Sequence, residues 1–181
     1  LIPGAGGNLR LISKLEDAQK LKVPGNFQVV QKAFQTIAFA KVSMSANHAQ
    51  SLGYLTKEDR VVINRDYLLN EAKNEVLKMA DNYSPPKYKD KIKLPGKTGR
   101  LAIESSIKGF QKSGKISEHD ALIGRKLSFV LTGGKKGGPL SGVSEQYLLD
   151  IEREVFLSLC GEEKSQARID HMLKKGKPLR N

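Results

Sequence analysis

The sequence is poor in cysteine and tryptophan. It has one cysteine, Cys160, and no tryptophan among 181 residues. A single cysteine excludes an intrachain disulfide framework and is typical of a reducing compartment, so we expect a cytoplasmic protein. No apolar run approaches the length that a bilayer requires, and no signal-peptide pattern opens the chain, so we expect no membrane span.

Acidic residues are also few. Thirty-one Lys and Arg residues stand against 19 Asp and Glu residues, which gives a net charge of +12. A surface of this kind attracts polyanions, such as nucleic acid, an anionic membrane or a phosphorylated cofactor. Hydrophobic residues make up 39% of the chain and aromatic residues 6%. Such a lean core indicates that a partner completes some apolar faces, and we expect self-association through helices.

Apolar residues recur at helical spacing over most of the chain, which predicts a mainly α protein of about seven helices with one short strand. The strand is expected at Arg60–Ile63. Expected helix caps are Asn8, Ser117 and Ser144, with Asp120 completing a capping box. The expected helices include residues 7–21, which Val23 and Pro24 would end, and residues 27–38, 65–80 and 163–175.

Composition divides the chain into three parts. Residues 83–98 are rich in Lys, Pro and Tyr and have no periodicity, so we interpret them as a linker or an extended arm. Residues 1–82 would precede this linker and residues 99–181 would form a helical region after it.

Several motifs have a functional and a plain interpretation. Lys97-Thr98 after Gly96 resembles the end of a phosphate-binding loop, but Lys91 stands where the first glycine belongs. Gly4, Gly6 and Gly7 do not complete a dinucleotide fingerprint, because Leu9 stands at the third glycine position and no strand precedes them.

The remaining candidates favour plain roles. The three histidines, His48, His119 and His171, are scattered without ligand spacing, so we predict no metal site. Cys160 lies on an apolar helix face and is interpreted as an inert thiol. The loop 133–138, which contains Lys135 and Lys136, could bind phosphate, but a mobile surface connection is the favoured interpretation.

The opening residues Leu1-Ile2-Pro3-Gly4-Ala5-Gly6-Gly7, followed by Leu9-Arg10-Leu11, form a glycine-rich turn that leads into a helix. This turn resembles the signature of the enoyl-CoA hydratase (crotonase) family, in which a small polar pair usually stands where this chain has Asn8-Leu9. Segments 46–55, 61–63, 68–80, 149–156 and 168–178 resemble later parts of that family in the same order. The longer segment 83–143 and the ending Lys177–Asn181 resemble the hydratase part of bacterial bifunctional 3-hydroxyacyl-CoA dehydrogenases.

This resemblance implies the C-terminal helical portion of a crotonase-like α/β spiral domain. It implies that the catalytic acids and the oxyanion-hole amides lie upstream of Leu1, so no catalytic residue is expected in this chain. The turn would form the floor of the site, with Pro3, Gly4, Gly6 and Gly7 contacting the substrate. The substrate would be an acyl-CoA thioester, with NAD serving a dehydrogenase half of the parent enzyme in fatty-acid β-oxidation, and the chain alone would be inactive.

A second hypothesis is a non-enzymatic helical module whose basic helices bind an anionic partner. The charge of +12 motivates it. Nucleic acid is the less favoured partner, because the basic residues are spread along the helices without the aromatic clusters of single-strand binders.

Overall fold

The computed structural model describes residues 1–18 and 25–181, and these residues are mainly helical. The expected helix 7–21 ends at Asp17, and its predicted stop at Val23 and Pro24 lies outside the described residues. The described helices are α1 (Gly7–Asp17), α2 (Phe27–Ala38), α3 (Ala46–Leu52), the 3₁₀ helix η1 (Arg65–Tyr67), α4 (Leu68–Ala80), α5 (Gly96–Lys112), α6 (Glu118–Leu131), α7 (Glu145–Cys160) and α8 (Glu163–Lys175). The mainly α prediction is confirmed.

The strand expected at Arg60–Ile63 is wrong. These residues are irregular, and the side chain of Ile63 is 99% exposed. A strand needs a neighbour to satisfy its backbone, and within residues 1–18 and 25–181 no strand pairs with this segment. In the described part of the chain, β pairing is limited to one antiparallel bridge, in which Ile92 and Val143 exchange N–H···O bonds of 2.8 and 3.0 Å.

Side-chain caps explain where several helices begin. The hydroxyls of Ser117 and Ser144 accept bonds from Asp120 N–H and Tyr147 N–H, and Ser117 with Asp120 forms the expected capping box. The prediction for Asn8 is wrong, because Asn8 lies inside α1, whose N-cap is Gly6. The amides at that helix start have a different acceptor, which is described below.

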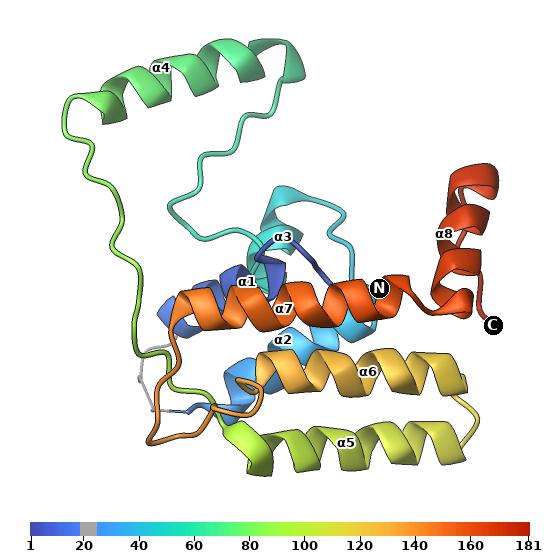
Figure 1. The fold of residues 1–181 in the computed structure, drawn as a ribbon. Helices are drawn as coiled ribbons and strands as arrows, with labels where there is room; N and C mark the ends of the chain where they lie inside the picture. The colour runs from blue at the N-terminus through green and yellow to red at the C-terminus, as the bar shows by residue number, and fades with distance from the viewer. Residues whose placement is uncertain (19–24) are drawn as a thin grey trace.

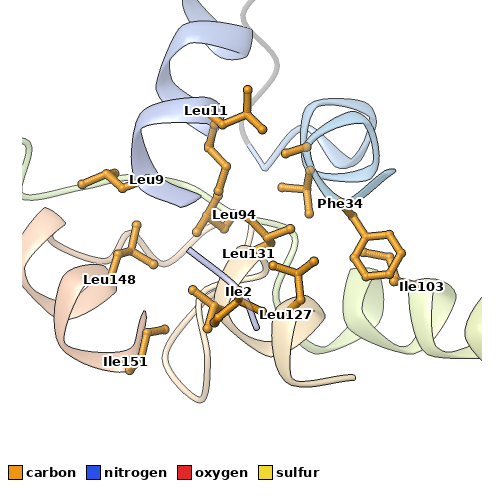
Figure 2. Close-up of a cluster of buried hydrophobic side chains, with 14 of the residues drawn as sticks. Ile2, Leu9, Leu11, Phe34, Leu94, Ile103, Leu127, Leu131, Leu148 and Ile151 are labelled. Atoms are coloured by element: carbon orange, nitrogen blue, oxygen red, sulfur yellow. The ribbon is translucent and has the colours of Figure 1, made fainter. Parts of the chain in front are cut away.

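One apolar core joins helices from both ends of the sequence. α6 lies at its centre and contacts α1, α2, α5 and α7 (Figure 1). The side chains around it come from the N-terminal segment, from α1 and α2, and from α5 to α7 (Figure 2). Residues 1–18 and 25–38 therefore depend on residues 92–159 for their burial.

Residues 60–88 form an arm that stands away from this body. Two extended connections carry α4, which Figure 1 shows well separated from the other helices. No residue between 60 and 91 is buried. The predicted linker 83–98 overlaps the first turn of α5, which begins at Gly96; the three-part division of the chain stays a prediction.

No helix among the described residues is long and apolar enough to cross a membrane.

Candidate functional site

The glycine-rich turn lies against the apolar core. Ile2 is buried and belongs to the apolar cluster, so it anchors the turn from inside. Gly4, Ala5 and Gly7 are exposed, whereas Gly6 is buried. The turn therefore presents one edge to solvent while its other edge packs on α7.

Glu152 of α7 holds the turn in place. Its carboxylate accepts bonds from Gly6 N–H at 2.6 Å and from Asn8 N–H at 3.1 Å, and the residue is only 1% exposed. Amides at a helix start have no partner within the helix, and the helix dipole favours a negative charge there. Glu152 therefore caps α1 from a helix more than 140 residues away in sequence.

Sequence reasoning missed Glu152 although a signal was present. The buried residues Leu148, Ile151, Val155 and Leu159 define one stripe of α7, and Glu152 falls on it four residues after Leu148. A carboxylate almost never occupies such a position unless it is paired.

Gly4 is needed for packing against α7. A Cβ added there would lie 2.6 Å from Cδ2 of Phe156. Gly6 has φ of +86°, and a Cβ there would lie 3.2 Å from Cδ2 of Leu149. Glycine is the residue that adopts such a φ without strain.

Gly7 and Pro3 face each other across the turn. A Cβ on Gly7 would lie 2.7 Å from Cβ of Pro3. The side-chain amide of Asn8 donates to the carbonyl of Pro3 at 3.3 Å, and Oδ1 of Asn8 is buried without a partner. The four residues predicted to contact substrate thus form one compact loop, and their contact with substrate stays a prediction.

A cavity of about 550 Å³ lies beside the start of this turn. Leu1 and Ile2 form part of its wall, and α2, α5, α6, α8 and the C-terminal segment form the rest. Most of its lining is apolar, including Phe34, Ile107 and Leu127. A cavity of this size and character suits a small molecule with a hydrocarbon part.

An ion pair closes one side of the cavity. Arg168 donates to Asp120 at 2.7 Å and to the side chain and backbone of Asn181 at 2.7 and 3.1 Å. Burial alone would raise the pKa of Asp120, but the bond from Arg168 and the N–H of Ser117 lower it below its usual range. The pair therefore fixes the C-terminal segment over the start of α6.

The other candidate residues lie in separate places. His48 Nδ1 accepts from Met44 N–H at 3.2 Å, whereas Nε2 of His119 lies 3.0 Å from Oγ of Ser165 in the core. Burial and then the charge of Arg168 lower the pKa of His119. Among the described residues, no three His, Cys, Asp or Glu side chains form a group that could hold a metal ion.

The lysine loop is built into the body. Gly137 N–H donates to the carbonyl of Gly133 at 2.7 Å, and Nζ of Lys136 lies 4.9 Å from the ring centroid of Tyr147. Lys97 and Thr98 lie in the first turn of α5, and Cys160 is half-buried at the end of α7. None of these residues lies in the turn.

The chain is similar to part of a longer protein. It is 47% identical over 182 residues to a protein of Bacillus subtilis (strain 168) named "Probable 3-hydroxyacyl-CoA dehydrogenase". The similarity covers 100% of this chain but only 22% of that protein. No protein-family profile matches the chain, and no solved structure matches it. The relative's name speaks of a dehydrogenase, so the resemblance to hydratases stays a prediction.

Proposed function

We propose that this chain is the C-terminal part of a larger enzyme of fatty-acid β-oxidation that acts on acyl-CoA thioesters. The parent would oxidise 3-hydroxyacyl-CoA with NAD and would also hydrate enoyl-CoA. The observation that carries the proposal is the 47% identity along the whole chain to a fifth-length stretch of a protein named as a 3-hydroxyacyl-CoA dehydrogenase. The opening turn supports the hydratase half through its resemblance to that family.

In this proposal the exposed edge of the turn faces the substrate. Gly4 and Gly7 leave the backbone uncovered there, and Pro3 and Gly6 fix its course. The apolar cavity beside Leu1 and Ile2 suits the hydrocarbon part of an acyl thioester. The catalytic acids would come from the part of the parent that precedes this chain.

The glycine-rich turn at the start of α1 does not fit NAD. A dinucleotide site places a pyrophosphate on free amides at a helix start. At α1 two of those amides are bonded to the carboxylate of Glu152, which would repel a phosphate. In this proposal NAD binds to another part of the parent enzyme.

The deciding experiment compares this chain with the longer protein that contains it. We expect the longer protein to reduce NAD with 3-hydroxybutyryl-CoA and to hydrate crotonyl-CoA, and residues 1–181 alone to do neither. A longer protein inert toward both thioesters would overturn the proposal. Hydration by the chain alone would overturn only the assignment of the acids to another segment.

The alternative is a basic helical module that binds an anionic partner without catalysis, which the net charge of +12 favours. Backbone phosphate contacts make such binding strongly salt-dependent. A gel shift of RNA or DNA that weakens steeply with salt would support this alternative, and no shift at low salt would exclude nucleic acid as the partner.

We also propose that the chain associates with itself through its helices. Apolar side chains that remain uncovered on helices support this proposal.

A further inference from the structure

The helix α4 has an apolar stripe that none of the described residues covers. None of its residues is buried, and the side chain of Leu69 is 82% exposed. The stripe follows helical spacing and consists of Leu68, Leu69, Ala72, Val76, Met79 and Ala80. An isolated helix of 13 residues is marginal in water, so its stability depends on a surface that packs against this stripe.

The positions of these apolar residues are symmetric about the middle of the helix. Counting from Asn74 as the midpoint, Leu68 corresponds to Ala80, Leu69 to Met79 and Ala72 to Val76. A second α4 running antiparallel would therefore place a residue of its own stripe opposite every residue of the first stripe. A twofold axis requires this self-complementarity, because the same patch serves on both copies.

The distribution of charge agrees with a second copy as the partner. Residues 60–88 contain five Lys and Arg and four Asp and Glu residues, so the arm has a net charge of +1 and the rest of the chain carries +11. Two arms therefore repel each other far less than two bodies would.

The glutamates of α4 do not oppose this contact. Arg60 pairs with Glu75 at 2.8 Å and also with Glu71, which neutralises them on one side of the stripe. Leu77 lies outside the stripe, since the residues one helical turn before it, Lys73 and Asn74, are polar. The apolar surface that a partner could contact is therefore a narrow stripe along one side of α4.

We propose that α4 pairs antiparallel with α4 of a second copy of this chain, and that this contact holds a twofold dimer. The proposal names the helix through which the self-association proposed above takes place, and it does not depend on the enzymatic proposal. The small residues Ala72 and Ala80 let the two helices approach closely. The bodies, with their positive charge, stay apart at the two ends of the pair.

The first test is the mass of the chain in solution, measured by sedimentation equilibrium. We expect a dimer for the unchanged chain. Leu69→Glu and Val76→Glu would each raise the dimer dissociation constant by at least about tenfold, because each buries an unpaired charge. Leu77→Glu is the matched control on the same helix, and it should leave the constant within about twofold because surface changes outside a contact have small effects.

The second test fixes the direction of the pair. In a Cys160→Ser background, copies with Ala72→Cys are mixed with copies that carry Val76→Cys and are then oxidised. The antiparallel pair predicts mixed disulfides between positions 72 and 76, whereas a parallel pair would join each position to itself. Circular dichroism and thermal unfolding show whether each variant keeps its fold.

Every outcome decides the proposal. A monomeric chain, or a dimer that Leu69→Glu and Val76→Glu leave intact, would overturn it. A dimer that gives only disulfides between identical positions would overturn the antiparallel direction. A monomer that becomes a complex only when the longer protein's other segments are added would assign the stripe to those segments instead.

Discussion

Glu152 is a carboxylate on the apolar stripe of α7, and its two acceptor bonds tie the turn to this helix. In Glu152→Ala, the N–H groups of Gly6 and Asn8 stay buried and lose their partner. We expect the free energy of unfolding to fall by roughly 2–4 kcal/mol, measured by urea denaturation. Glu154→Ala is the control, because Glu154 lies exposed on the same helix. Equal losses in both variants would contradict this role for Glu152.

His119 gives the chain a pH-dependent stability. The pKa of His119 in the native state is lowered by burial and by the charge of Arg168, with Glu162 acting in the opposite direction. The imidazole therefore takes up its proton near pH 6.5 in the unfolded chain but only at lower pH in the native chain. Stability should fall as the pH drops through about 6.5, because protons favour the unfolded state there.

Urea denaturation between pH 7.5 and 5 measures this effect, in a window set by the ordinary pKa of histidine at about 6.5. His119→Gln should flatten the dependence, because glutamine does not titrate. His48→Gln should keep it, since His48 is exposed. If both variants keep the same slope, another group carries the effect.

At the scale of helices, the entry into α1 depends on a glycine. Gly6→Ala would place a Cβ at φ of +86° and 3.2 Å from Leu149, and we expect a loss of about 1–2 kcal/mol in stability. Gly109→Ala is the contrasting change, since a Cβ there meets nothing within 4 Å in the exposed part of α5. It should stabilise the chain by about 0.5–1 kcal/mol, so the two melting temperatures should move in opposite directions.

Helices and caps could be predicted because their causes are local. The spacing of apolar residues predicts α2, and Ser117 with Asp120 predicts the start of α6. The acceptor at α1 could not be found in the same way, because Glu152 reaches it only after the chain has folded. Asn8 has a side chain that commonly caps helices, but it lies inside α1. The distant carboxylate of Glu152 accepts the bonds from the amides at this helix start instead.

At Arg60–Ile63 the local sequence predicts a strand that does not form. A short apolar run predicts a strand only if a second strand is available, and local sequence does not show whether one is. The candidate site has the same limit. The turn is visible in the sequence, whereas the cavity beside it is built from α2, α5, α6 and α8 and from a C-terminal segment held by Arg168.

At the scale of the whole molecule, the body and the arm are energetically separate. The core joins α1 and α2 to α5, α6 and α7, while residues 60–88 contribute no buried side chain. After the arm, the chain rejoins the body at Lys89, whose carbonyl accepts a bond from Glu145 N–H at 3.0 Å. Removal of residues 60–88 therefore leaves the contacts of the apolar core and this bond in place.

Replacing residues 60–88 by a glycine and serine linker long enough to join the two ends should change the unfolding free energy of the body by less than about 1 kcal/mol, because no buried group is removed. The same change should make the chain monomeric, because it removes the surface that we propose for the dimer. Urea denaturation and sedimentation equilibrium on one preparation measure both effects.

A large loss of stability would show that the arm packs on the body in solution. A dimer that persists without the arm would show that the copies meet through another surface, such as the exposed residues of α8. Because the two measurements respond to different contacts, one variant separates the contribution of the arm to folding from its contribution to assembly.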